Sequence, residues 1–497
     1  MTKTEAVIKL GLETISLDKQ ALVFVNSKRS AEKTAEEIAK KIKNVELKKF
    51  SDKILKTLSN PTRQCQRLAE CVTRGIAFHH AGLAAEQREF IEDKFREGKI
   101  KIICATPTLA FGLDLPAFRA IIKDLRRFTP RGLQWIPVLE YLQQSGRAGR
   151  PKFDSFGESI AIAKTSSEKK KIKEQYIEGE PEEIYSKLAV EPVLRTYLLS
   201  LISSGFVNSE KEIFNFFEKT FWAHQYEDME ELKYKIRSML GLLEKFEFIK
   251  YNEEKESYTA TIIGERVSQL YIDPLTANFM IKNIKKKTDG DDFAILQLVS
   301  YTLEMRPLLR TRKSDEFVED ELIEREEDLL FKVDEWNMNY PHFLNSIKTG
   351  LFFLDWVNEK TEDYLMEKYS IRPGEVRAKL NLCDWLLYAL EELCKLGSNR
   401  DIISDVIKLR LRLKYGAKEE LLPLLRLKGI GRVRARKMFR NGIKNLRDLK
   451  SVKMDKLSMI VGKNVALNVK EQIGQNKKGG LKGGLMGFSM RQGDNQA

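Results

Sequence analysis

The chain has 497 residues, of which 42% are hydrophobic and 32% charged, and its formal net charge is +14. That length exceeds what one hydrophobic core supports, so about three or four domains are expected. The positive charge favours a polyanionic partner, because clustered Lys and Arg release counterions when they meet phosphate; a basic protein from a lysine-rich proteome is the alternative. The five cysteines form no CxxC pair, and no apolar run approaches the roughly 20 residues that cross a bilayer. These features predict a cytoplasmic protein with reduced thiols, no zinc site and no membrane contact.

Residues 1–170 alternate short apolar runs with amphipathic stretches, which is the pattern of a parallel α/β domain. The run 21–25 predicts a buried strand, followed by a polar turn in which Ser30 can cap a helix that ends near Ile42. Further strands are predicted at residues 75–79, 101–104, 120–123 and 159–163.

After residue 170 the pattern is mainly helical. Strand-like runs at 248–251 and 257–262 flank a charged turn, and helices followed by such a hairpin suit a winged helix. The leucines between 386 and 396 recur at helical spacing, which favours a buried helix face over a ligand site. The end of the chain, 475–497, is rich in Gly, Lys and polar residues and is expected to be disordered.

The strongest chemical signal is the run Gln-Gln-Ser-Gly-Arg-Ala-Gly-Arg at residues 143–150. Arg147 and Arg150 lie three residues apart in a glycine-punctuated turn, so both guanidinium groups can project from one surface. Arginine suits phosphate because its planar fork binds two oxygens and keeps its charge. The alternative is a helix start with two solvated arginines. The pattern resembles motif VI of superfamily-two helicases, which implies that Arg147, Arg150 and Gln143 act at the γ-phosphate of ATP.

A second motif leaves the predicted strand at 101–104 through two threonines. The hydroxyls of Thr106 and Thr108, together with nearby backbone amides, are suited to phosphate oxygens. Residues 104–117 resemble motif V, which touches the nucleic-acid backbone and couples it to ATP. The resemblance therefore also assigns Gly112 and Asp114, with Gly146 of motif VI, to the nucleotide site.

Two shorter matches precede these motifs in the expected order. Residues 25–29, with Asn26 and Ser27, resemble motif IV, and residues 78–83, with His80, resemble motif IVa. Each match alone is weak, because adjacent histidines are usually ordinary surface residues. Four motifs in the correct order and spacing make the assignment specific, and they imply that Asn26, Ser27 and His80 contact nucleic acid.

Between motifs V and VI, residues 126–135 combine Pro and Gly with aromatic and basic side chains. Pro and Gly predict a turn, while Arg127, Phe128 and Arg131 suit stacking on bases and contact with phosphate. We expect a hairpin that separates the strands of a duplex; an ordinary surface hairpin is the alternative.

Residues 422–437 contain a glycine-punctuated turn followed by basic residues. Gly429 and Gly431 allow a loop between two short helices to approach a phosphate, and Arg434 and Arg436 can bind it. This is the helix-hairpin-helix pattern, which binds DNA without reading its sequence. A glycine-rich helix joint is the alternative. Residues 461–464 predict a degenerate second hairpin.

Together, residues 21–474 resemble the archaeal HelQ-type fork-repair helicases, on the motifs above and on the segments 178–182 and 270–276. The resemblance implies 3′–5′ movement on single-stranded DNA, unwinding of forks, and an aromatic, here Trp385, that contacts the bases; a core tryptophan is the alternative. Ala378 stands where the family often has Arg, with Arg377 and Lys379 beside it. The implied order is a second RecA-like domain (1–170), a winged helix (171–266), a helical ratchet bundle (267–414), a helix-hairpin-helix domain (415–474) and the tail (475–497).

The sequence lacks the P-loop pattern G-x-x-x-x-G-K-[ST] and an acidic motif for Mg²⁺ after a buried strand. We therefore expect ATP and Mg²⁺ to bind at an interface with a separate polypeptide that carries the Walker A and DExH motifs; a truncated chain is equally compatible. Alone, the chain is expected to be inactive. The rival hypotheses are a DNA-binding protein that lost its motor and an RNA helicase, against which the helix-hairpin-helix pattern argues.

Overall fold

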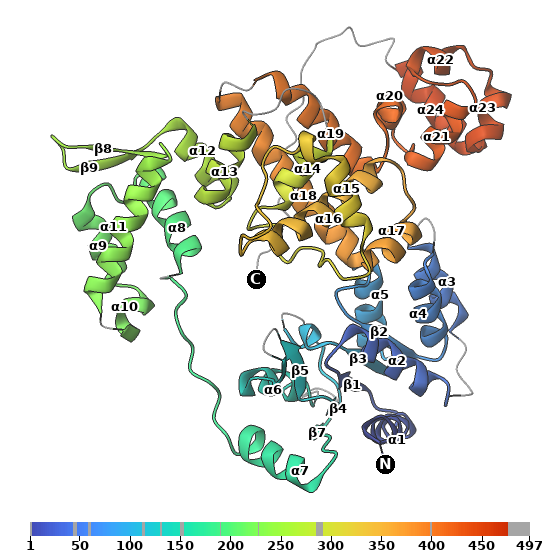
Figure 1. Cartoon of the computed structure of the whole chain (residues 1–497). Helices are drawn as coiled ribbons and strands as arrows, with labels where there is room; N and C mark the ends of the chain where they lie inside the picture. The colour runs from blue at the N-terminus through green and yellow to red at the C-terminus, as the bar shows by residue number, and fades with distance from the viewer. Residues whose placement is uncertain are drawn as a thin grey trace. The chain divides into compact units, whose positions relative to one another are not determined.

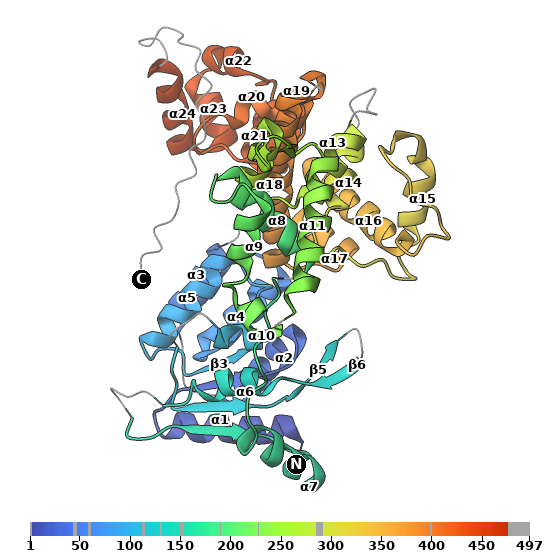
Figure 2. The same cartoon turned by 90° about the vertical axis from the view of Figure 1, so that its left-hand side faces the viewer.

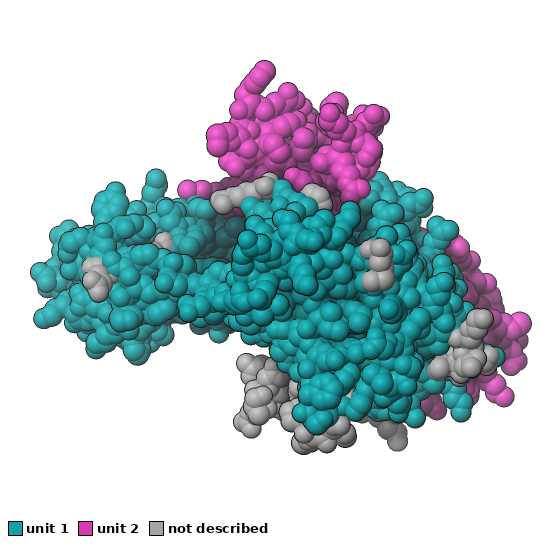
Figure 3. All heavy atoms as spheres, turned by 90° about the horizontal axis from the view of Figure 1, so that it is seen from below, with its two compact units in different colours: residues 1–278, 303–305, 362–383 teal, residues 279–302, 306–361, 384–497 magenta. Residues whose placement is uncertain are grey.

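The computed structural model describes residues 2–42, 47–57, 61–111, 115–129, 132–149, 154–188, 190–226, 228–284, 292–397 and 400–475. These residues form two compact units, coloured separately in Figure 3: residues 1–278, 303–305 and 362–383, and residues 279–302, 306–361 and 384–497. Of the predicted site residues, Gly112, Asp114, Arg131 and Arg150 lie outside the described residues, as does the tail after residue 475. The domain boundaries drawn from the sequence stay a prediction.

The first unit contains a five-stranded parallel sheet in the order β2-β3-β1-β4-β7 (Figure 1). Its strands are β1 (Ala21–Phe24), β2 (Ile76–His79), β3 (Ile102–Ala105), β4 (Arg119–Ile122) and β7 (Glu158–Ala161). All five strands lie within two residues of the predicted ones. Four are fully buried, because helices cover the sheet and leave no strand face for water; only the edge strand β7 is partly exposed.

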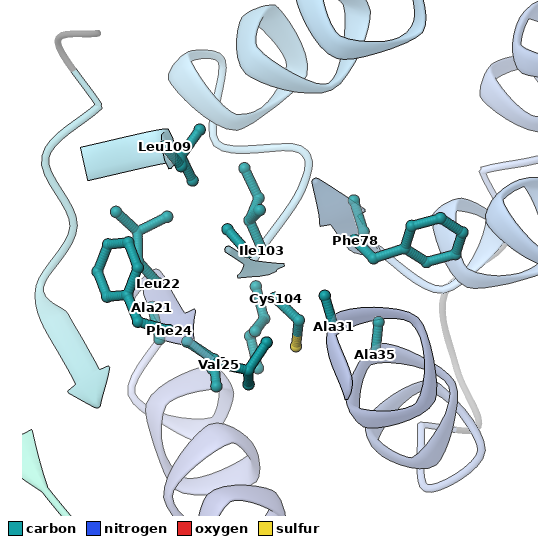
Figure 4. Close-up of a cluster of buried hydrophobic side chains, with 14 of the residues drawn as sticks. Ala21, Leu22, Phe24, Val25, Ala31, Ala35, Phe78, Ile103, Cys104 and Leu109 are labelled. Atoms are coloured by element: carbon teal, nitrogen blue, oxygen red, sulfur yellow. The ribbon is translucent and has the colours of Figure 1, made fainter. Parts of the chain in front are cut away.

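The helices around this sheet are α1 (Lys3–Ser16), α2 (Lys28–Ala39), α3 (Lys48–Lys56), α4 (Arg63–Thr73), α5 (Ala85–Arg96), the short η1 (Pro107–Ala110) and α6 (Val138–Ser145). Figure 4 shows how small residues of α2 allow it to lie close on the sheet: Ala31 and Ala35 lie beside Phe78 and Cys104. The cap of α2 is Ser27, whose hydroxyl accepts a hydrogen bond from the Ser30 amide at 3.1 Å. The prediction that Ser30 caps this helix was wrong, because the extended residue with a free hydroxyl comes one turn earlier.

A two-stranded antiparallel hairpin interrupts the α/β pattern, formed by β5 (Arg126–Thr129) and β6 (Gly132–Trp135). It extends away from the parallel sheet (Figure 2). The hairpin predicted between motifs V and VI is therefore present, although its tip lies outside the described residues.

After the sheet come α7 (Ser166–Ile172) and the π-helical turn η2 (Lys173–Ile177), whose Tyr176 hydroxyl donates to the Ile136 carbonyl at 2.6 Å. The helices α8 (Glu191–Ser203), α9 (Glu210–Phe217), α10 (Phe221–Tyr226) and α11 (Met229–Lys245) then lead into the antiparallel strands β8 (Ile249–Asn252) and β9 (Ser257–Ala260). This succession of helices and a hairpin is the one predicted for a winged helix.

The rest of the described chain is helical, as predicted. It comprises α12 (Ile262–Leu270), α13 (Pro274–Ile284), α14 (Asp292–Ser300), α15 (Phe317–Glu324), η3 (Glu326–Asp328), α16 (Tyr340–Val357), α17 (Glu362–Tyr369), α18 (Pro373–Leu396), η4 (Arg400–Ile402) and α19 (Ile403–Tyr415). Leu386, Leu387, Leu390 and Leu393 of α18 are buried, which confirms the predicted apolar face, whereas Leu396 is exposed.

The last elements form a small helical core of their own. They are η5 (Glu419–Leu421), α20 (Leu422–Leu425), α21 (Arg432–Arg440), α22 (Leu446–Ser451), α23 (Met454–Val461) and α24 (Lys463–Gln475). Buried leucines, alanines and Met438 hold these short helices together. Gly429 (φ +83°) lies in the turn between α20 and α21, and Gly462 (φ +91°) lies in the turn between α23 and α24. A glycine turn between two helices is therefore present at both predicted hairpins.

Candidate nucleotide and nucleic-acid interface

Motif V begins where β3 ends. The Thr106 and Thr108 hydroxyls lie 3.0 Å apart on the turn that opens η1, and Thr108 is exposed. The Thr106 amide donates to the His79 carbonyl at 3.3 Å, which holds the turn against the end of β2. Both hydroxyls can therefore face an oxygen of a bound backbone at the carboxyl edge of the sheet, where parallel sheets bind ligands.

Motif VI follows the end of α6 and is hydrogen-bonded to motif V. The Arg147 guanidinium donates to the Ala110 carbonyl at the end of η1. The Ala117 amide donates to the Arg147 carbonyl at 2.9 Å, and the Gly149 amide donates to the Ala117 carbonyl at 2.7 Å. A shift of motif VI therefore shifts both ends of the motif V loop.

In the described part of the chain, the Ala110 carbonyl that holds the Arg147 guanidinium is a neutral group. Gln143 is exposed. Sequence reasoning missed its neighbour Gln144, which is 1% exposed and whose two amide atoms have no hydrogen-bond partner among the described residues. Glu140, one turn earlier, is also buried, with one unpartnered oxygen, and burial raises its pKa although Arg127 lowers it.

Motif IV places two polar residues at the start of α2. Asn26 and Ser27 are both exposed, and the Asn26 side-chain amide donates to the Arg126 carbonyl at 3.1 Å. This turn therefore combines a helix N-terminus with two exposed polar side chains, a combination suited to phosphate.

The structure contradicts the prediction that His80 contacts nucleic acid. Its side chain is fully buried and stacks on Phe78, with ring centroids 5.6 Å apart. Its Nδ1 accepts a hydrogen bond from the Gly82 amide, so Nε2 carries the proton and donates it to Glu32 at 3.1 Å. Burial lowers the pKa of His80. A neutral imidazole inside the fold cannot meet a DNA backbone.

The hairpin β5–β6 is anchored at its base. The Arg126 guanidinium lies 4.2 Å from the centre of the Trp135 ring, and Arg127 donates to Glu140 at 2.6 Å. Phe128 lies on β5, but its side chain and Arg131 are outside the described residues. The hairpin is confirmed, and its use as a strand-separating wedge stays a prediction.

Trp385 lies on α18 and is half-buried, between the fully buried Cys383 and Leu386. Trp385 is therefore less enclosed than these neighbours, and its contact with a base stays a prediction. Beside the missing arginine, Arg377 is exposed, whereas Lys379 is buried and donates to the Met305 carbonyl at 3.1 Å. Burial lowers the pKa of Lys379.

The first glycine hairpin, residues 428–431, is open to an incoming ligand. A Cβ atom added at Gly429 or Gly431 would meet nothing within 4 Å. Arg434 is exposed and donates to the Gly429 carbonyl at 2.9 Å, which places its charge beside the turn. Arg436 is different, because its guanidinium pairs with Glu359 and with Glu420. The prediction that Arg436 binds phosphate is contradicted, since two carboxylates already occupy it.

In the described part of the chain, no helix is long and apolar enough to span a bilayer, and no three potential ligand side chains gather at one metal position. All five cysteines are buried free thiols.

Three segments match known domain families. Residues 2–152 match the helicase conserved C-terminal domain, residues 157–250 match a helix-turn-helix domain, and residues 293–416 match domain 4 of archaeal helicases. Each match coincides with a structural region described above: the parallel sheet, the helices that precede the β8–β9 hairpin, and the helical part that contains α18.

The chain is also similar to curated proteins named ATP-dependent DNA helicase Hel308. It is 38% identical over 460 residues to the one from Pyrococcus horikoshii, which covers 91% of this chain and 64% of that relative. It is 37% identical over 487 residues to the one from Methanococcus vannielii, which covers 88% of this chain and 64% of that relative. The chain thus spans a little under two thirds of the length of these relatives. The likeness is to archaeal Hel308-type helicases; the HelQ-type assignment and the absence of a first RecA-like domain stay predictions.

Proposed function

We propose that this chain is the C-terminal part of an ATP-dependent 3′–5′ DNA helicase that acts on forked or branched DNA in repair and recombination. The observation that carries the proposal is the hydrogen-bonded junction of motifs V and VI, in which the Arg147 guanidinium bonds to Ala110 within motif V and the Arg147 carbonyl bonds to Ala117 at its end. The names of the relatives support DNA as the substrate and ATP as the energy source.

The nucleotide site is completed by a separate polypeptide. This chain offers the guanidinium groups of Arg147 and Arg150 for phosphate, but it has no P-loop. The donor set therefore fits one side of an ATP site and does not enclose the phosphates. Mg²⁺, when bound with ATP, neutralises phosphate charge, and its carboxylate ligands come from the DExH-bearing polypeptide. This chain's part is to place two positive charges and to hold motif V beside them.

DNA is held by several independent surfaces. Ser27, Thr106 and Thr108 bind the backbone at the edge of the sheet, while Trp385 stacks on a base. The hairpin at Gly429 and Gly431, with Arg434, binds phosphate without reading sequence. A DNA-binding protein that lost its motor has no use for an arginine tied to the motif V turn, which favours the helicase.

The test is DNA-stimulated ATPase measured on this chain, on a polypeptide carrying the first RecA-like domain of a Hel308-type helicase, and on their mixture. We expect activity and unwinding only in the mixture. Robust hydrolysis by this chain alone would refute the split site. Matched DNA and RNA forks in the same assay decide the substrate, and stronger unwinding of RNA would favour the RNA-helicase alternative.

A further inference from the structure

The carboxyl edge of the parallel sheet carries four segments in a fixed order. The sheet runs β2-β3-β1-β4-β7 with every pair of neighbours parallel, so the segments that follow the strands all leave from one edge. Motif V follows β3, motif IV follows β1, the β5–β6 hairpin follows β4, and α7 follows β7. Along this edge the hairpin therefore lies between motifs IV and V on one side and α7 on the other.

Contacts at the base of the hairpin agree with this order. On one side, the Asn26 side chain of motif IV donates to the Arg126 carbonyl at the start of β5. On the other side, the Lys171 ammonium of α7 lies 5.1 Å from the centre of the Trp135 ring at the end of β6. A DNA strand bound along motifs IV and V would thus have the hairpin between itself and α7.

The two faces of the hairpin differ in charge. Side chains alternate between the faces of a strand, so Arg126 lies on one face with its cross-strand partner Trp135 and with Leu133. Arg126 and Leu133 are exposed, and Trp135 is half-buried. Arg127 lies on the opposite face, where Glu140 of α6 binds its guanidinium at 2.6 Å. The face with Arg126 is therefore the one that offers a cation to a ligand.

Helix α7 adds positive charge beside that face. Residues 164–173 contain one acidic residue, Glu168, which accepts a hydrogen bond from Lys3 at 2.8 Å. The same range contains five lysines, all exposed: Lys164, Lys169, Lys170, Lys171 and Lys173. The surface next to the hairpin base is thus strongly cationic.

Two of the cations at this surface converge on one aromatic ring. The Arg126 guanidinium and the Lys171 ammonium lie 4.2 Å and 5.1 Å from the centre of the Trp135 ring. Within the described ranges, neither of them forms an ion pair with a carboxylate, whereas Lys173 pairs with Glu178 at 2.9 Å. Two like charges held close together without a counterion favour an anion between or beside them.

The neighbourhood of Lys171 has room for such an anion. Lys171 lines a hollow on the surface of α7 together with Ser167, Lys170, Glu174 and Gln175. Lys170 lies 3.7 Å from Glu174, so Lys171 is the cation of the hollow that no carboxylate among these residues engages. A hollow with ammonium, hydroxyl and amide groups on its rim can accept a phosphate.

The aromatic ring beside this hollow is held in place by its own packing. Trp135 lies against Tyr176, with ring centroids 6.1 Å apart, and the Tyr176 hydroxyl donates to the Ile136 carbonyl. The ring is therefore fixed while part of it stays accessible. Cations that track a phosphate backbone, next to an aromatic ring on which a base can stack, are the combination that binds single-stranded nucleic acid.

We propose that Arg126, Trp135, Lys170 and Lys171 form a binding surface for the displaced DNA strand, here called the α7 surface. The proposal rests on the proposed function, because only a strand-separating motor produces a displaced strand. The tracked strand follows motifs IV and V, the hairpin divides the duplex, and the strand with the 5′ tail passes onto the α7 surface. Binding there keeps the separated strands from pairing again behind the hairpin.

The first experiment measures binding to two DNA molecules that share one duplex. One has a 3′ tail only, and the other is a fork with both tails. Lys171→Gln and Arg126→Gln should each flatten the plot of log affinity against log salt by about 0.7 on the fork, the value for one single-strand phosphate contact. On the DNA without a 5′ tail, both variants should have the slope of the wild type.

The matched control is Lys173→Gln, which removes the same charge from the adjoining turn but from a lysine that Glu178 already pairs. It should bind both DNA molecules like the wild type. Equal losses on the two DNA molecules, or a loss in Lys173→Gln as large as in Lys171→Gln, would show a general effect of charge and overturn the α7 surface.

The second experiment identifies the strand at the α7 surface. The five native cysteines are buried, so Lys171→Cys can be labelled selectively with a benzophenone maleimide. Illumination on a fork whose two strands carry different dyes should crosslink the strand that bears the 5′ tail. A crosslink confined to the strand with the 3′ tail, or no crosslink to DNA, would overturn the proposal.

This crosslink needs neither ATP nor the motor polypeptide, so its outcome is separate from that of the ATPase test. If the mixture has no DNA-stimulated ATPase but the 5′-tailed strand is crosslinked, the proposed function fails and the α7 surface remains a fork-binding surface. If the mixture unwinds DNA while position 171 crosslinks only the 3′-tailed strand, the α7 surface fails alone.

Discussion

Motif VI and the 428–431 hairpin are both glycine turns followed by arginines, and the sequence predicts phosphate binding for the arginines of both. The structure shows that these arginines have different partners. In motif VI, Arg147 is held by the neutral Ala110 carbonyl, and in the 428–431 hairpin Arg434 is held by the Gly429 carbonyl. Among the residues that the structure describes, neither arginine pairs with a carboxylate. Arg436, two residues after Arg434, meets two carboxylates instead and is neutralised within the protein. From these contacts we expect Arg147 and Arg434 to remain available to phosphate, and Arg436 not to.

The largest effect should come from motif VI. Arg150→Ala should abolish ATP turnover in the mixture and Arg147→Ala should impair it severely, because an arginine that meets the transferring phosphoryl group is worth about 10³ to 10⁵ in rate. Steady-state ATPase with saturating DNA measures this. Arg434→Ala is the matched control and should hydrolyse ATP normally on saturating DNA. If Arg150→Ala left the ATPase of the mixture unchanged, motif VI would be an ordinary turn. Its comparison with the 428–431 hairpin would then fail.

Arg436 should matter for stability. Its side chain and that of Glu359 are 19% and 17% exposed, so Arg436→Ala leaves a largely buried carboxylate without its partner. We expect the free energy of unfolding to fall by about 1–3 kcal/mol, the usual cost of a buried group that loses a charged hydrogen bond. Thermal unfolding measures it, with Arg434→Ala as the control that should melt like the wild type. If Arg436→Ala left the melting temperature unchanged, Arg436 would again be a candidate phosphate ligand.

The same pair predicts a pH dependence. Burial raises the pKa of Glu359, but the hydrogen bond from Arg436 and the Lys418 amide outweigh burial and lower it below its ordinary 4.5. A carboxyl whose pKa is lowered by folding stabilises the fold above its unfolded pKa, and that contribution is lost as the pH falls through the folded value. The difference in melting temperature between wild type and Arg436→Ala should therefore shrink as the pH falls below about 4.5, the ordinary pKa of a glutamate side chain. A constant difference over that range would show that the ion pair is not its source.

The smallest effect concerns Arg434. Arg434→Ala should weaken binding of unrelated single-stranded sequences equally and flatten the plot of log affinity against log salt by about 0.7, the value for one phosphate contact. Titrations at several salt concentrations measure it. Arg436→Ala, tested where it is fully folded, should leave the slope unchanged. A loss of affinity confined to one sequence would indicate base recognition.

Much of the first unit could be predicted because its signals are local. A continuous apolar run bounded by a polar turn, as at 21–25, produces a buried strand wherever the sheet places it. The β5–β6 hairpin follows equally from Pro and Gly between two strand-forming runs. The failures at His80 and Ser30 have a different origin: a histidine beside a strand end can face either side, and a polar turn offers several possible caps. The Ser27 cap was decided by which residue became extended.

The order of the motifs, the parallel strands and the helical segments after residue 170 were thus determined by the sequence alone. Hydrophobic periodicity and turn-forming residues act over a few positions in the chain. The fate of the charged side chains was decided only by the tertiary structure. Glu32 meets Arg372 and Glu359 meets Arg436 across separations at which no local pattern can pair them. An arginine that pairs with a carboxylate stabilises the fold, whereas we expect an arginine held by a backbone carbonyl to remain available to a ligand. Which of the two groups an arginine meets depends on tertiary packing.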